Sequence, residues 1–131
     1  MPAPGLDRVD DVLAAARAAG LDVTLRADVV APTLPSKVSN AAYRVVQESV
    51  SNVVTHSDAR SVFVDLRCAD EELVVMVSDD GRGRTDAADR AGWGITGMRE
   101  RVSLLGGRLL AGNRAAGGFA VEAHLPLRQH A

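Results

Sequence analysis

The sequence predicts a two-layer α/β sandwich of the α+β kind, in which helices cover one face of a mixed, mostly antiparallel sheet. Two pairs of strand-like segments are each joined by a short turn, and three segments have helical spacing of apolar residues. Because hairpins dominate the order α-β-α-β-β-loop-α-β-β, most strand pairs should be antiparallel. The predicted helices span residues 6–19, 35–55 and 95–105, and the predicted strands span residues 21–29, 60–66, 73–78, 108–112 and 119–125.

The first helix and strand follow from simple periodicities. Apolar residues recur at helical spacing from Leu6 to Ala16, and Gly20 supplies the usual signal for a helix C-terminus. Residues 21–29 then alternate apolar and polar side chains, which predicts a half-buried strand. A proline-containing connector, residues 31–35, leads into the next helix.

The long helix begins at Pro35 or Ser36, ends near Thr55, and carries valines along one arc. Glu48 and Asn52 lie one turn apart on the border of that arc, where they can reach a cleft between helix and sheet. An asparagine offers Mg²⁺ a neutral oxygen ligand, and a glutamate offers a base or a water-orienting group. The alternative is a solvated pair at the rim of the helix.

Two glycine-rich runs flank a polar span. Residues 79–83 (Asp-Asp-Gly-Arg-Gly) end a buried-strand pattern, and Asp79 there can accept a hydrogen bond from an exocyclic amine. Residues 92–97 (Gly-x-Gly-x-x-Gly) open a helix, whose free N–H groups and positive dipole end suit phosphate. The runs therefore predict a base pocket and a phosphate-binding site. The alternative is that the glycines only form turns between the elements. A dinucleotide-binding fingerprint is disfavoured because a loop, residues 82–91, precedes the second run. We expect that loop to be mobile and to order over bound phosphates.

Composition narrows the class of protein. The 131 residues predict one domain, 1–131, and the 47% apolar and 24% charged fractions are ordinary for a soluble globular chain. A net charge of −2 gives no electrostatic case for nucleic acid or an acidic membrane. Without a membrane-length apolar run or a signal peptide, a cytoplasmic location is expected. The single Cys68 excludes an internal disulfide, and its strand pattern predicts a buried, inert thiol.

These motifs together resemble those of bacterial sensor histidine kinases. Residues 43–59 resemble the N box, residues 79–83 the first glycine box, and residues 92–102 with 105–107 the second. The Gly-Met-Arg-Glu-Arg run at residues 97–101 resembles the subfamily that partners NarL-type response regulators. The resemblance covers the whole chain, and the three boxes occur in the family's order.

The resemblance implies the Bergerat ATP-binding fold of the GHKL superfamily, with ATP and Mg²⁺ as ligands. Position by position, it implies that Asp79 contacts the adenine amino group, that Asn52 ligates Mg²⁺ and that Glu48 assists phosphoryl transfer. It also implies a set of nucleotide-contacting residues in the two glycine boxes. Those that shape the adenine pocket or border the lid and receive phosphates are Gly81, Gly83, Gly92, Gly94, Ile95, Thr96 and Gly97.

Two positions depart from the family pattern. Thr55 stands where a basic residue usually precedes the N-box histidine, here His56, so a phosphate contact is missing or comes from Arg82 or Arg84. Phe119 stands where the family has a threonine near the adenine site.

The resemblance also implies partners. The family's phosphoacceptor histidine lies on a separate dimerisation domain that nothing here matches, so this segment, expected to be a monomer, would bind ATP and act on that domain, with a NarL-type response regulator downstream. The alternatives are an anti-sigma-factor-type serine kinase and a nucleotide-sensing module without transferase activity.

Overall fold

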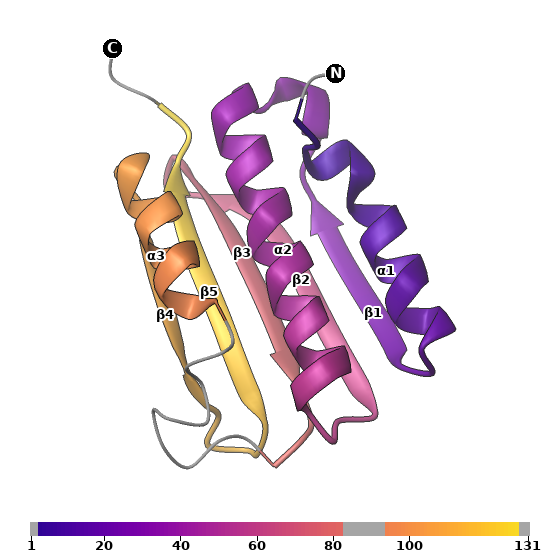
Figure 1. The fold of residues 1–131 in the computed structure, drawn as a ribbon. Helices are drawn as coiled ribbons and strands as arrows, with labels where there is room; N and C mark the ends of the chain where they lie inside the picture. The colour runs from indigo at the N-terminus through magenta and orange to yellow at the C-terminus, as the bar shows by residue number, and fades with distance from the viewer. Residues whose placement is uncertain (1–2, 83–93, 129–131) are drawn as a thin grey trace.

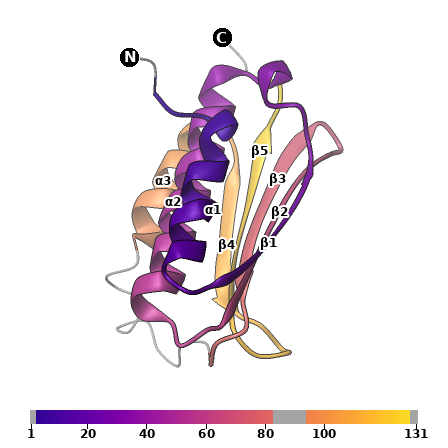
Figure 2. The same ribbon diagram turned by 90° about the vertical axis from the view of Figure 1, so that its right-hand side faces the viewer.

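The computed structural model describes residues 3–82 and 94–128, and it confirms the predicted sandwich. Five strands form one sheet in the order β1-β2-β3-β5-β4, with β1 and β2 parallel and the other neighbours antiparallel. The helices lie side by side over one face of the sheet, and the other face is open (Figures 1 and 2). The helices are α1 (Val9–Ala18), α2 (Ser36–His56) and α3 (Ile95–Leu104), and the strands are β1 (Asp22–Asp28), β2 (Ser61–Ala69), β3 (Glu72–Asp79), β4 (Arg108–Asn113) and β5 (Phe119–Pro126).

The observed elements differ from the predicted ones mainly at their ends. A 3₁₀ turn, Leu6–Arg8, replaces the first turn of the predicted helix, and a second one, Ala31–Thr33, occupies the connector. The strand β2 extends past residue 66 because Asp70 and Glu71, with φ of 52° and 63°, close a tight hairpin turn. The ladder with β3 then continues to the pair Ala69 and Glu72.

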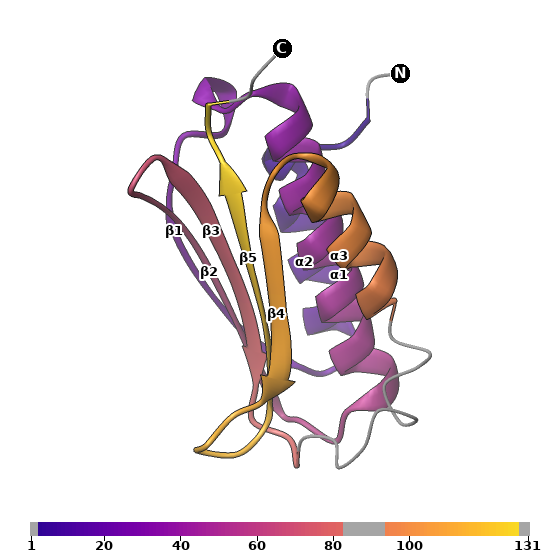
Figure 3. The same ribbon diagram turned by 90° about the vertical axis from the view of Figure 1, so that its left-hand side faces the viewer.

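The prediction of a buried thiol at Cys68 was wrong, because this side chain is exposed. Cys68 has the same strand parity as the buried Val64 and Leu66. It lies next to the hairpin turn, however, where β2 and β3 extend away from the helices (Figure 3). Burial at this end of the sheet therefore does not follow strand alternation alone, since the cross-strand partner of Cys68, Leu73, is fully buried.

Valines build the core between α2 and the sheet. On α2, Val38, Val45 and Val46 are fully buried, and they face an inner sheet surface that includes Val62 and Val75. Full burial of such a side chain contributes roughly 1.5–3 kcal/mol, so this contact fixes α2 on β3 and β5. The C-terminal ends of α2 and β3 consequently lie at the same end of the sandwich, and α3 begins beside the C-terminal half of α2 (Figure 1).

Across the described ranges 3–82 and 94–128, the structure contains no helix with the length and apolar character needed to cross a bilayer.

Candidate functional site

Asn52 of α2 and Asp79 at the end of β3 line the same small cavity. It has a volume of about 10 Å³ and lies between α2 and the inner face of the sheet, with Phe119 and Val121 of β5 on its wall. Asn52 is 6% exposed, Asp79 2% and Phe119 4%. Two polar side chains from distant segments therefore converge on one buried point, and the space between them holds about one water molecule.

Burial raises the pKa of Asp79 above its ordinary value. Backbone N–H groups oppose this shift: that of Gly81 donates to Oδ1 at 2.8 Å, and that of Phe119 also donates to the carboxylate. The neighbouring charge of Asp80 raises the pKa, whereas that of Arg114 lowers it. The carboxylate is thus desolvated and held in one orientation by two backbone donors, which suits it to accept a further directed hydrogen bond.

Glu48, one turn before Asn52, lies beside the start of α3. Gly94, which caps that helix with φ of 67°, packs so closely against this side chain that an added Cβ would collide with Oε1. Glu48 is half-buried, and next to Gly94 it faces helix N–H groups that attract negative charge. Two adjacent turns of α2 therefore face two different parts of the structure. Asn52 faces β3 and β5, and Glu48 faces the start of α3.

The other residues of the second glycine run are not all directed to this site. Ile95 packs against the core, whereas Thr96 and Gly97 are exposed on the first turn of α3. Gly83 and Gly92, together with the predicted mobile loop from residue 83 onward, lie outside the described residues.

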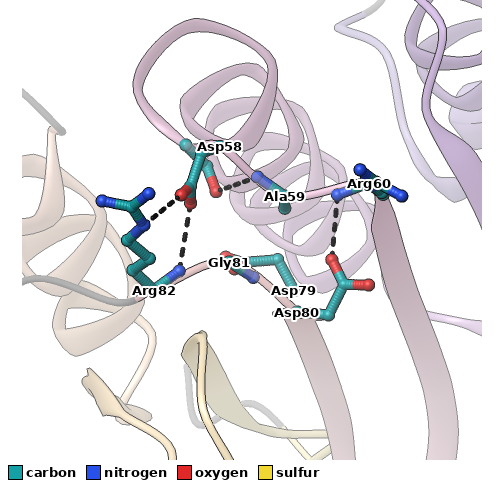
Figure 4. A network of polar contacts seen from close by, with 8 residues as sticks. Asp58, Ala59, Arg60, Asp79, Asp80, Gly81 and Arg82 are labelled. Atoms are coloured by element: carbon teal, nitrogen blue, oxygen red, sulfur yellow. Dashed lines mark hydrogen bonds and ion pairs between the residues drawn. The ribbon is translucent and has the colours of Figure 1, made fainter.

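The segment after β3 is tied to the connection between α2 and β2 by carboxylates (Figure 4). Asp58 accepts the backbone N–H of Arg82 at 3.0 Å and pairs with its Nε at 2.9 Å. Arg82, one of the two arginines that could replace the missing basic residue at Thr55 as a phosphate contact, pairs with Asp58 in this structure. Beside it, Asp80 accepts the N–H groups of Arg60 at 2.9 Å and Ser61 at 3.0 Å. The bond from Ser61 is the largest cause of a lowered pKa at Asp80.

Three residues of this region were not predicted as site residues: Asp58, Arg114 and Gly118. Arg114 donates to the carbonyl of Asp79 at 3.1 Å, and Gly118 abuts the same carbonyl. The glycine pair at residues 117 and 118 suggests a turn, but only the sheet order brings that turn next to β3.

A larger groove, of about 350 Å³, lies between α1 and α2. Its walls are mostly apolar, and its charged side chain, Asp11, is exposed. Because a ligand site usually combines an enclosed surface with a few convergent polar groups, the smaller cavity at Asn52 and Asp79 is the stronger candidate.

Comparison with known proteins identifies the family of this chain. The family described as "Histidine kinase-, DNA gyrase B-, and HSP90-like ATPase" matches residues 37–129, which include α2 and all of the sheet except β1. The chain therefore belongs to this family.

Curated relatives of the chain are sensor kinases. It is 41% identical over 86 residues to the signal transduction histidine-protein kinase/phosphatase UhpB of Salmonella typhimurium. This alignment covers 66% of this chain and 17% of UhpB. It is 33% identical over 109 residues to the sensor histidine kinase YxjM of Bacillus subtilis, covering 82% of this chain and 26% of YxjM. The chain thus spans about a sixth to a quarter of the length of these relatives.

Among solved structures, the fold is similar to that of the blue-light activated histidine kinase EL346 of Erythrobacter litoralis. The TM-score is 0.76 at 24% identity, over 95% of this chain and 42% of that one. This likeness confirms the predicted fold class.

Proposed function

We propose that this chain is the ATP-binding catalytic domain of a two-component sensor histidine kinase. It positions Mg·ATP for phosphoryl transfer to a histidine on a separate dimerisation domain. The observation that carries the proposal is the convergence of Asn52 and Asp79 on one buried cavity, in a chain of this ATPase family. Phosphoryl transfer requires mainly positioning and charge stabilisation, and these side chains supply groups of that kind.

In this proposal Asp79 recognises the adenine amino group. Its carboxylate is buried, and the N–H groups of Gly81 and Phe119 fix its direction. The cavity of about 10 Å³ is smaller than a purine, so base binding requires α2 and β5 to separate or the Phe119 ring to turn. Phe119 then forms an apolar wall of the base pocket in place of the family's threonine.

The phosphates and the metal are assigned to Asn52 and Glu48, on adjacent turns of α2, and to the start of α3. The chemistry of the donor set fits Mg²⁺: an amide oxygen at Asn52 and a carboxylate at Glu48, one turn apart, are hard oxygen ligands. Asn52 would hold the ion, which supplies charge neutralisation to the phosphates. Glu48 assists the transfer, and the N–H groups near Gly94 receive phosphate oxygens, with Gly83, Gly92, Ile95, Thr96 and Gly97 completing the two glycine boxes.

The partners follow from the same proposal. They are ATP, the dimerisation domain of the kinase and, through it, a NarL-type response regulator; the segment itself is a cytoplasmic monomer that does not bind nucleic acid. A second candidate is a nucleotide-sensing module without transferase activity, because Thr55 lacks the positive charge that the family places before the N-box histidine, and a nucleotide can bind without being positioned for transfer.

Transfer to a supplied acceptor separates these functions. The purified chain is mixed with the dimerisation domain of its parent kinase, labelled ATP and Mg²⁺, beside a dimerisation domain whose phosphoacceptor histidine is replaced by alanine. The proposal predicts acid-labile label on the first acceptor and none on the second. ATP binding without label on either acceptor would favour the sensing module.

A further inference from the structure

We propose that Arg114 is a positioning residue for Asp79: from the turn between β4 and β5 it holds the end of β3 and thereby fixes the carboxylate. The inference rests on the proposed function, which assigns base recognition to that carboxylate. Arg114 lies outside the N box and both glycine boxes, so its role comes from contacts and not from a motif.

The contact is made at one backbone atom. Arg114 Nη1 donates to the carbonyl oxygen of Asp79 at 3.1 Å, across 35 positions of the chain. The ladder between β3 and β5 ends at the pair Ser78 and Ala120, one residue before Asp79. The guanidinium therefore bonds a carbonyl at the point where the sheet stops supplying partners on that side.

The turn is shaped to reach this carbonyl. It is closed by the N–H of Arg114 on the carbonyl of Gly118 at 2.9 Å, and by the N–H of Gly117 on the carbonyl of Arg114 at 3.1 Å. Gly118 has φ of 91°, and an added Cβ there would collide with the carbonyl oxygen of Asp79. The next residue, Phe119, donates its N–H to the Asp79 carboxylate. Three residues of one turn thus act on the backbone and the side chain of Asp79.

The positive charge of Arg114 also acts on the Asp79 carboxylate, in addition to the hydrogen bond to its backbone carbonyl. Within residues 3–82 and 94–128, the charges that act on the Asp79 carboxylate are those of Asp80, next in the chain, and Arg114, and Asp58 approaches the neighbouring Gly81 from the connection after α2. From α2 the neighbouring polar group is the neutral amide of Asn52. Burial raises the pKa of Asp79 overall; the backbone N–H groups of Gly81 and Phe119 oppose this shift most, and the positive charge of Arg114 adds a smaller contribution in the same lowering direction.

The test compares wild type with Arg114→Ala, Arg114→Gln and Arg114→Lys in the complete chain. One readout is ATP affinity by calorimetry, and the other is the titration of the Asp79 carboxyl by carbon NMR, assigned with Asp79→Asn. Arg17→Ala is the matched control. Arg17 Nη2 likewise donates to a backbone carbonyl, that of Val23 at 3.2 Å, but on β1, at the edge of the sheet away from β5 and β4. Circular dichroism verifies folding, and the lysine and glutamine variants serve if the alanine variant does not fold.

We expect Arg114→Ala to weaken ATP binding about two- to tenfold, the range of one partly exposed hydrogen bond. The Asp79 titration should move to higher pH in the alanine and glutamine variants and stay near wild type in Arg114→Lys, which keeps the charge. Arg17→Ala should change neither readout.

An unchanged Asp79 titration in Arg114→Ala overturns the inference, as does a shifted titration with unchanged ATP affinity. If wild type binds no ATP, the proposed function fails instead. The titration then decides the positioning role alone, because it needs no nucleotide.

Discussion

The carboxylate of Glu48 packs directly against the backbone of Gly94, so that this side chain of α2 touches the start of α3 at a position that has no side chain of its own. Gly94 has φ of 67°, where a side chain is already strained. The contact joins the acidic residue assigned to phosphoryl transfer to the helix N-terminus assigned to phosphate. Its geometry makes a specific prediction about the two positions together.

Gly94→Ala should slow phosphoryl transfer by displacing the Glu48 carboxylate, while destabilising the fold by only about 1 kcal/mol. The carboxylate is the far end of a flexible side chain, so it moves more easily than the backbone does. In a Glu48→Ala background, Gly94→Ala should slow transfer no further. Rates of transfer to a supplied dimerisation domain measure the coupling between the two positions.

Gly20→Ala is the control for backbone strain. Gly20 has φ of 99°, and nothing lies within 4 Å of an added Cβ, so this variant reports the strain alone. Chemical denaturation should give similar losses of unfolding free energy for Gly20→Ala and Gly94→Ala. Additive effects of Gly94→Ala and Glu48→Ala on the transfer rate would contradict the assigned contact.

Asn52→Ala and Glu48→Gln should separate binding from transfer. Asn52→Ala should remove the Mg²⁺-dependent part of ATP affinity, because it deletes the proposed amide ligand. Glu48→Gln keeps the shape of the side chain, so ATP binding should stay nearly intact while transfer slows by about 10²-fold or more, as for loss of a general base. Titrations with Mg²⁺ and with EDTA measure the first effect, and equal Mg²⁺ dependence in wild type and Asn52→Ala would rule out the metal role.

Asp79 should make the folded state less stable as pH rises. Its folded pKa is raised by burial, so its favourable contribution is complete below the unfolded pKa of about 3.9 and is lost as pH rises through the folded pKa. Relative to wild type, Asp79→Asn should therefore gain stability as pH rises from about 4 to 7. Urea denaturation at several pH values measures this difference, and a constant difference across the range would contradict it.

For Asp80, the next residue, the contribution to stability should depend on pH in the opposite direction. Hydrogen bonds from the N–H groups of Ser61 and Arg60 lower its pKa, so its contribution is present above the unfolded pKa and is lost as pH falls through the folded one. Asp80→Asn should be less stable than wild type at neutral pH, by under about 1 kcal/mol because the site is exposed. The deficit should shrink in acid, and a deficit that grows as pH falls would count against these bonds.

The fold was predictable because its signals are local. Valine spacing identified α2 to within a residue of its ends, and strand alternation identified the hairpins. Helical spacing put Asn52 at the border of its helix and the strand pattern put Asp79 at the end of its strand, but their convergence on one cavity was not predicted, because it depends on how α2 packs on β3 and β5. The contacts of Arg114 and Asp58 were not, because they depend on which turns the sheet order brings together. Cys68 was mispredicted for a related reason, since the alternation within one strand does not show where along the strand the side chains stop being covered.

Calorimetric titration of ATP into wild type and Asp79→Asn tests the central assignment most directly. Losing a buried, charged hydrogen-bond partner weakens binding by on the order of 2–3 kcal/mol, roughly fifty-fold or more. We expect saturable ATP binding to wild type in the presence of Mg²⁺ and no measurable binding to a folded Asp79→Asn. Equal ATP affinity in the two proteins would show that the carboxylate at the end of β3 does not recognise the base, and would contradict the account.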